Sequence, residues 1–195
     1  IMPSLVGSEM CIRDSDDTDE RFDASVRTKF YDKNGNLLTS AADPEYIAPH
    51  CKKYEDYDRV MDAGASSKNI YFIRYADLIL LYAECLLAEN DLAGAKQQVI
   101  RVRNRAKVST PITASNNTEM LDFIYEERMR ELGMEGWRRM DLIRRGADYF
   151  AAQVDKYNPF AKGNVQPYHA FYPIPTNEIN MNDGIGAEDQ NEGYK

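Results

Sequence analysis

The sequence predicts an all-α fold, in which a tetratricopeptide-like helical scaffold carries irregular loop excursions and ends in an irregular C-terminal tail. Two observations predict it. Apolar residues recur at spacings of three and four between residues 70 and 150, which is the period of a helix with one buried side. Ala83 and Ala95 stand twelve positions apart, like the small residues that let the two helices of a tetratricopeptide unit cross closely.

Composition divides the chain into three parts. Residues 1–15 are similar to translated sequencing-adapter sequence and carry no usable signal peptide. We therefore expect them to be non-native, and we expect upstream sequence of the natural protein to be missing. Residues 16–69 are polar and rich in turn formers, which predicts a loop-rich excursion with short strands, one of them over residues 21–30, and a hairpin turn at Asn34-Gly35. Residues 70–195 are the predicted helical domain.

Four helices are predicted in this last part. The first, over residues 70–89, is apolar on nearly every side, so we expect neighbours to bury it all round, with Cys85 in the core. The second, over residues 92–107, carries one apolar stripe. A third helix, capped by Asn117 or Thr118, and a fourth follow up to about residue 150, and recurring prolines and glycines then predict the irregular tail.

The composition argues against several classes of function. A net charge of −8, with basic residues interleaved among acids, argues against a nucleic-acid partner, which needs clustered Lys and Arg. No stretch reaches the ~18 apolar residues of a membrane span. The sequence has no Gly-rich phosphate loop and no nucleophile elbow. His50 and His169 have no ligand partner at metal spacing, so we expect no cofactor and no metal.

Acids and arginines alternate across the end of the third helix. Three carboxylates spaced by four residues precede arginines that can fold back on them across a glycine corner. The pattern fits paired carboxylates for acid–base catalysis, or an ion-pair network that fixes the angle between two helices. We favour the structural interpretation, because neighbouring arginines lower the pKa that a catalytic acid needs raised. This ion-pair motif comprises Glu127, Glu131, Glu135, Arg138, Arg139, Asp141 and Arg144.

Four segments between residues 70 and 195 carry a family resemblance. They are residues 74–84 (Arg-Tyr-Ala-Asp-Leu-Ile-Leu-Leu-Tyr-Ala-Glu), residues 127–132 with 135–144 (Glu-Arg-Met-Arg-Glu-Leu and Glu-Gly-Trp-Arg-Arg-Met-Asp-Leu-Ile-Arg), residues 172–179 (Tyr-Pro-Ile-Pro-Thr-Asn-Glu-Ile) and residues 190–194 (Gln-Asn-Glu-Gly-Tyr). In this order they resemble the C-terminal region of the SusD/RagB family of outer-membrane nutrient-binding proteins. Arg145 departs from the family pattern, which often has Trp there.

The resemblance implies a glycan-binding protein and not an enzyme. It implies a surface-exposed lipoprotein of the cell outer membrane, which captures oligosaccharides or polysaccharides and delivers them to a TonB-dependent, SusC-like transporter. Such a protein would meet the membrane only through a lipid anchor, and we expect this anchor to be missing from the sequence. Sugar contacts in the family are mostly aromatic side chains on loop excursions, so Tyr54 and Tyr57 are the candidate ligand-binding residues. Trp137 follows a helix corner and is predicted to anchor the core.

Two other functions stay open on the residues alone. Tetratricopeptide hairpins bind peptides and partner proteins on their concave face, so a protein–protein interaction scaffold is the main alternative. A glycoside hydrolase using Glu127 or Glu131 would need two carboxylates facing each other in an open cleft without arginine partners. Exposed aromatic side chains near residues 46–57 would favour glycan binding, and an open groove on the helices would favour the scaffold.

Overall fold

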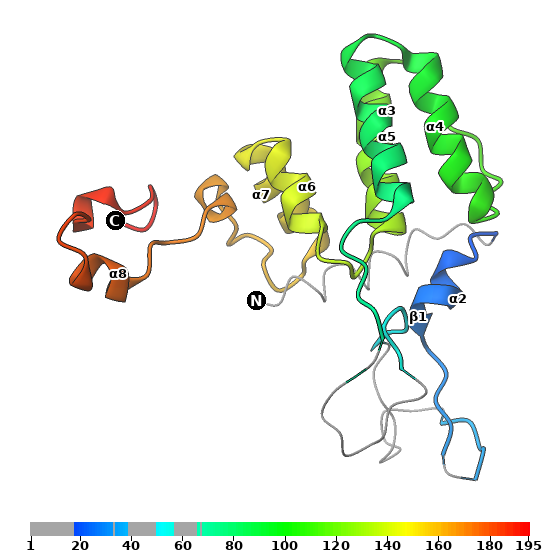
Figure 1. Cartoon of the computed structure of the whole chain (residues 1–195), viewed down its shortest axis with the longest axis horizontal. Helices are drawn as coiled ribbons and strands as arrows, with labels where there is room; N and C mark the ends of the chain where they lie inside the picture. Colours follow the sequence, from blue (N-terminus) through cyan, green and yellow to red (C-terminus); the bar gives the residue numbers. More distant parts are fainter. Residues whose placement is uncertain (1–17, 33, 39–49, 57–65, 67) are drawn as a thin grey trace. The chain divides into compact units, whose positions relative to one another are not determined.

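The computed structural model describes residues 18–32, 34–38, 50–56, 66 and 68–195. The chain divides into two compact units, Ile1–Arg138 and Arg139–Lys195. Helices dominate the described residues (Figure 1), which confirms the all-α prediction. The elements in chain order are α2 (Arg21–Ser25), β1 (Val26–Arg27), β2 (His50–Cys51), α3 (Tyr75–Ala88), α4 (Leu92–Arg105), α5 (Asn117–Glu131), α6 (Arg138–Arg144), α7 (Ala147–Tyr157), η1 (Pro167–Ala170), α8 (Thr176–Met181) and η2 (Ala187–Asp189).

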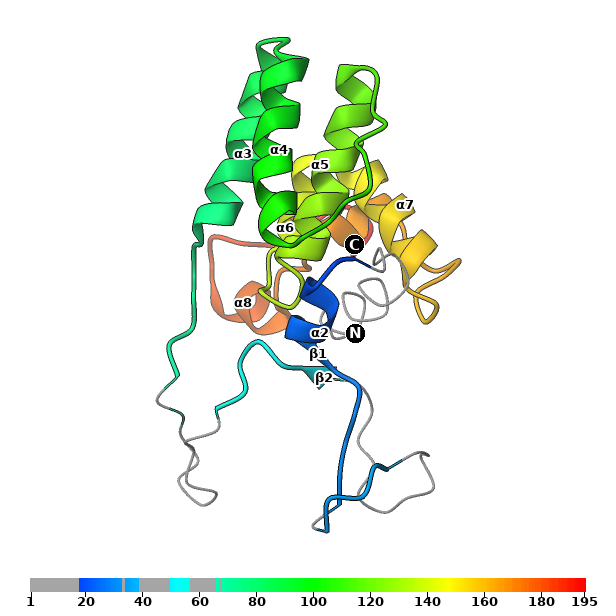
Figure 2. The same cartoon turned by 90° about the vertical axis from the view of Figure 1, so that its right-hand side faces the viewer.

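Three helices build the core of the first unit. α3 and α4 form a hairpin that turns at Asn90, whose φ of 63° lies in the left-handed region, and α5 packs against both helices (Figures 1 and 2). Ala83 and Ala95 are fully buried, so two small side chains lie in the core of the helix hairpin, as the sequence predicts. The buried cluster consists of Leu80, Ala83, Leu87, Ala95, Val99, Val102, Ala114, Met120 and Ile124.

Side-chain caps define where two of these helices begin. The carboxylate of Asp91 accepts a hydrogen bond from the backbone N–H of Gly94 at 2.8 Å, at the start of α4. At the start of α5, the side chain of Asn116 accepts one from the N–H of Glu119 at 3.0 Å. The cap of α5 is therefore Asn116, one residue before the expected Asn117, whose amide donates to Asn90 Oδ1 at 3.0 Å.

The outer side of α3 is exposed, contrary to the prediction that neighbours bury this helix all round. α4 and α5 cover the side that carries Leu80 and Ala83, whereas Tyr75, Leu78 and Tyr82 are 67%, 51% and 54% exposed. Cys85 is also exposed and not in the core. The reason is geometric, because the two helices that pack against α3 in the first unit, α4 and α5, cover only one of its sides.

The segment before the helical core differs from the strand expected over residues 21–30. Its first half is the short helix α2, and only Val26 and Arg27 pair as a strand, antiparallel to Cys51 and His50. The turn expected at Asn34-Gly35 is present. Asp32 donates its N–H to Asn36 O at 2.9 Å, and Gly35 supplies the left-handed φ of 84° that this turn requires.

Hydrogen bonds between two stretches of irregular backbone stabilise the tail of the second unit. The Gln190 amide donates to Ile174 O at 2.9 Å and accepts from Ile174 N–H at 2.7 Å, so one side chain satisfies both polar groups of one residue. Asn191 donates to Tyr172 O at 2.7 Å, and the Tyr194 hydroxyl donates to Phe171 O at 3.1 Å. The two C-terminal segments of the family resemblance thus pair with each other.

Replacing Gly193 with alanine is expected to lower the stability of this tail by about 1–3 kcal/mol. Gly193 has a φ of 85°, and an added Cβ would collide with the ring of Tyr168. Gly163→Ala is the matched control, since Gly163 has a similar φ of 78° but open space around the added Cβ. Hydrogen exchange at residues 171–194 measures the difference. Equal effects of the two substitutions would show that Tyr168 does not pack against Gly193.

Candidate functional site

Glu131 lies at the centre of a buried ion-pair network in the first unit. Its side chain is 1% exposed and contacts three guanidinium groups. Arg105 Nη2 donates to both carboxylate oxygens, at 2.7 and 2.6 Å. Arg74 Nη1 donates to Oε1 at 2.9 Å, and Arg21 Nη1 donates to Oε2 at 3.3 Å. One carboxylate at the end of α5 is therefore surrounded by arginines from α2, α4 and the residue before α3.

Glu127 and Glu135 extend this network in both directions. Glu127, which is fully buried, accepts from Arg21 at 2.7 Å and from Arg103 at 3.2 Å. Glu135 accepts two hydrogen bonds from Arg74, both at 2.8 Å, in a bidentate arrangement.

Lys53 completes the Glu135 end of the network. Its ammonium donates to Glu135 Oε1 at 2.7 Å, and to the backbone oxygens of Glu131 and Gly133 at 3.0 and 2.9 Å. Burial would raise the pKa of Glu135, but the hydrogen bonds from Arg74 and Lys53 outweigh it and hold that pKa below its ordinary value.

The arginines of the sequence motif contact other groups in the structure. Arg138 donates to Tyr125 O at 3.2 Å, within the first unit. In the second unit, Arg144 pairs with Asp141 at 3.0 Å, and Arg139 donates to the backbone oxygens of His169 and Ala170, both at 3.0 Å. The network partners that Glu127, Glu131 and Glu135 find on other elements were missed by sequence reasoning, because no local spacing marks a pairing between residues 24 to 110 positions apart.

The network forms one side of a pocket in the first unit. The pocket has a cavity volume of about 240 Å³. Two tyrosines and four cationic side chains line it together with two carboxylates and the small residues of α2. The lining residues are Arg21, Ala24, Ser25, Lys53, Tyr54, Tyr71, Arg74, Arg105, Glu131 and Glu135.

The structure places one of the two candidate ligand-binding tyrosines in this pocket. Tyr54 is partly buried in the pocket wall. Its hydroxyl has a raised pKa, because burial and the negative charge of Glu135 both disfavour the phenolate. Tyr57 lies outside the described residues. Tyr71, which sequence reasoning missed, also lines the pocket and is 61% exposed. Its only sequence signal was a place in an apolar stretch just before α3.

Trp137 is only partly buried, which differs from the predicted core anchor. Its ring lies 5.7 Å from that of Phe72, in a tilted arrangement at 58°, and Phe72 itself is 78% exposed. The pair therefore packs at the surface of the first unit, because the turn between α5 and α6 brings Trp137 to the exposed segment that precedes α3.

Neither a metal site nor a membrane span is found in the described part of the chain. No three His, Cys, Asp or Glu side chains gather there in a way that could hold a metal ion. His169 instead accepts a hydrogen bond from the N–H of Gln166 through Nδ1, at 2.9 Å. Over the same residues, every helix is too short or too polar to cross a bilayer.

The comparisons with known proteins identify the family of this helical chain. The SusD family model matches residues 8–194, so the chain belongs to the SusD family. NanU of B. fragilis has a similar solved structure, with a TM-score of 0.63 and 25% identity over 100% of this chain and 39% of NanU.

Two curated relatives match this chain over only part of their own length. The SusD-like protein P25 of Formosa agariphila is 34% identical over 134 residues, which cover 66% of this chain and 25% of the relative. The starch-binding protein SusD of Bacteroides thetaiotaomicron is 32% identical over 142 residues, which cover 70% of this chain and 23% of the relative. The chain thus spans about a quarter of the length of these relatives.

Proposed function

We propose that this chain is part of a glycan-binding subunit that captures oligosaccharides and delivers them to a TonB-dependent, SusC-like transporter. Its place would be the surface of the outer membrane, with a lipid anchor as its only membrane contact. The family supports this proposal, as does the name of one relative, starch-binding protein SusD. The observation that carries it here is the pocket, which Tyr54 and Tyr71 line together with a fixed set of charged donors.

Ligand binding fits this site better than catalysis. A glycosidase needs a protonated carboxylic acid with a raised pKa, whereas the pKa of Glu135 is lowered by Arg74 and Lys53 once burial is overcome. Glu131 is surrounded by three arginines, and Glu127 is fully buried. We therefore propose that these acids fix the pocket walls and that the protein is not an enzyme.

Replacing Tyr71 with alanine is expected to weaken glycan binding roughly tenfold, because the exposed ring offers an apolar face to a sugar. Titration calorimetry of the chain against a panel of neutral and acidic oligosaccharides measures this. Tyr31→Ala is the matched control, since Tyr31 is similarly exposed, at 57%, and does not line the pocket. Unchanged affinity in Tyr71→Ala would place the binding surface elsewhere.

An interaction scaffold is the second candidate function. It is favoured by one observation, the outer side of α3, on which Tyr75, Leu78 and Tyr82 are exposed together. Apolar side chains gathered on one helix face are typical of a surface that meets another protein. A peptide or protein that binds this face with no glycan binding in the pocket would support the scaffold instead.

A further inference from the structure

The ion-pair network beneath the pocket contains one more cation than it has carboxylates. Among the described residues, its members are joined by shared partners into one connected set of six cations and five carboxylates. An excess of positive charge is unexpected in a chain of net charge −8. The cations are Arg21, Lys53, Arg74, Arg103, Arg105 and Arg130, and the carboxylates are Asp19, Glu126, Glu127, Glu131 and Glu135.

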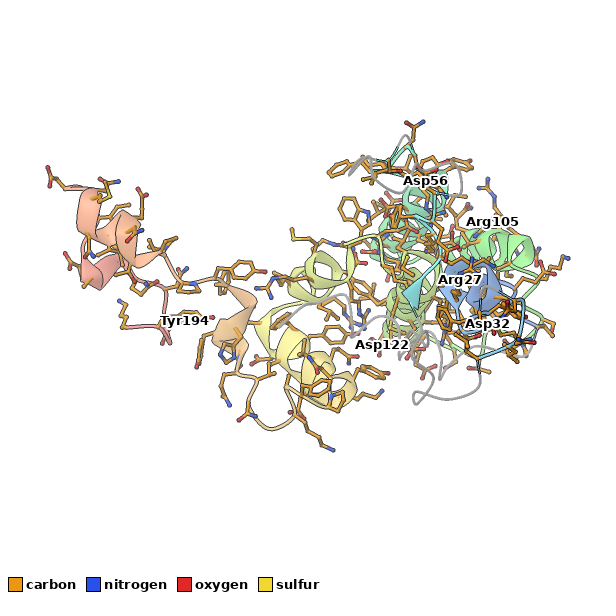
Figure 3. The ribbon with its side chains drawn as sticks, turned by 90° about the horizontal axis from the view of Figure 1, so that it is seen from below. Arg27, Asp32, Asp56, Arg105, Asp122 and Tyr194 are labelled. Carbon is orange, nitrogen blue, oxygen red and sulfur yellow. The ribbon has the colours of Figure 1, made fainter. Side chains whose placement is uncertain are left out.

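Of the four cations that line the pocket, Arg105 is the one whose donors stay available to a ligand. Its Nη2 binds Glu131, whereas its Nε and Nη1 donate to none of the described residues, and its side chain is 59% exposed at the pocket (Figure 3). The donors of the neighbouring Lys53 and Arg74 are already used in hydrogen bonds within the network. Lys53 makes three hydrogen bonds, and all three nitrogens of Arg74 donate to Glu131 or Glu135. At the pocket, the unused donors of this positively charged network therefore belong to one guanidinium.

Two tyrosine side chains share this pocket with Arg105. Tyr54 and Tyr71 line the same pocket, and neither hydroxyl has a hydrogen-bond partner among the described residues. A phenol presents an apolar ring face together with a donor, and this combination suits a sugar ring that carries a polar substituent. The pocket thus offers a cation, several N–H and O–H donors and two aromatic rings.

We propose that this pocket binds the anionic group of an acidic sugar residue, with Arg105 as its counterion and Tyr71 against the sugar ring. The inference rests on the proposed glycan-binding function and deepens it by naming the class of glycan. One bound negative charge would bring the connected network to neutrality. Guanidinium groups pair strongly with oxyanions through charge-assisted hydrogen bonds, and a neutral sugar would leave the excess charge of Arg105 to water.

The test compares glycans that differ only in this charge. Calorimetric titrations of the chain use an oligogalacturonate, its carboxyl-reduced neutral counterpart and a sulfated galactan oligosaccharide, at low and at high salt. The oligogalacturonate is expected to bind roughly tenfold or more tightly than the neutral form at low salt, with a smaller ratio at high salt. The titration with the sulfated oligosaccharide shows whether the pocket also binds a sulfate ester in place of a carboxylate.

Arg105→Gln is expected to abolish the preference for the acidic glycan, so that the acidic and the neutral form bind with equal affinity. Arg101→Gln is the matched control, because Arg101 is an exposed arginine of the same helix that does not line the pocket, and it should keep the preference. If Arg105→Gln fails to fold, the acidic-to-neutral ratio of the parent and its salt dependence decide. Equal affinity for the two forms, or a preference that survives Arg105→Gln, overturns the inference and leaves the proposed function standing. Binding of none of these glycans overturns both.

Discussion

Replacing Glu131 with alanine is expected to lower the free energy of unfolding by about 1.5–3 kcal/mol, because it removes a buried carboxylate that accepts charge-assisted hydrogen bonds from three arginines. Three arginines contact this carboxylate, and the side chain of Arg21 is only 10% exposed. Without Glu131, Arg21 retains Asp19 and Glu127, whereas Arg105 loses every hydrogen bond it makes to a described residue. Urea unfolding of the variant and the parent measures the loss.

Glu126→Ala is the control for this substitution. Glu126 lies on the same helix, its side chain is 44% exposed, and it pairs with Arg130 across one helical turn at 3.5 Å. Its loss should therefore cost at most about 0.5 kcal/mol. The structural interpretation of the network would be contradicted by a Glu131→Ala variant that unfolds like the parent but has lost glycan binding, since the carboxylate would then serve the ligand and not the fold.

The positions of α3, α4 and α5 and the crossing of α3 and α4 could be predicted from the sequence, because they depend on local periodicity and on two small residues, Ala83 and Ala95. The single fourth helix expected up to about residue 150 is wrong, because the chain forms α6 and α7 with a break at Gly146, and α7 runs to Tyr157. The segments 172–179 and 190–194 could be recognised only through family resemblance, and their pairing was not predicted, since side-chain amides bonded to irregular backbone leave no periodic signal. The sequence therefore located the C-terminal segments but did not explain what holds them.

The candidate site was harder to predict than the fold. The acids of α5 were visible as a spacing of four, but their arginines lie in α2, just before α3 and at the end of α4, far away along the chain. Pairing at such distances is decided by packing and not by local pattern. Tyr71 was hidden for a similar reason, because an apolar stretch predicts burial, whereas α4 and α5 leave the segment before α3 exposed.

The same exposure predicts how the chain behaves in solution. The outer side of α3 carries Tyr75, Leu78 and Tyr82, and the segment before it carries Ile70 and Phe72, which are 80% and 78% exposed. Helical repeat units bury such faces against neighbouring helices, so we expect upstream helices of the natural protein to cover this one. Expressed without them, the chain should associate through this face, with a mass by light scattering that rises with concentration.

The double variant Leu78→Glu/Tyr82→Gln is expected to be monomeric and to keep the parent's helical content, because both side chains are more than half exposed and lie outside the buried cluster. Leu37→Glu is the control, since Leu37 is 48% exposed on another segment of the first unit, and this variant should associate like the parent. A parent chain that is a monodisperse monomer at all concentrations, and that melts cooperatively, would show that the α3 face needs no partner. Micromolar glycan binding by that monomer would further show that this part of the protein binds its ligand without additional helices.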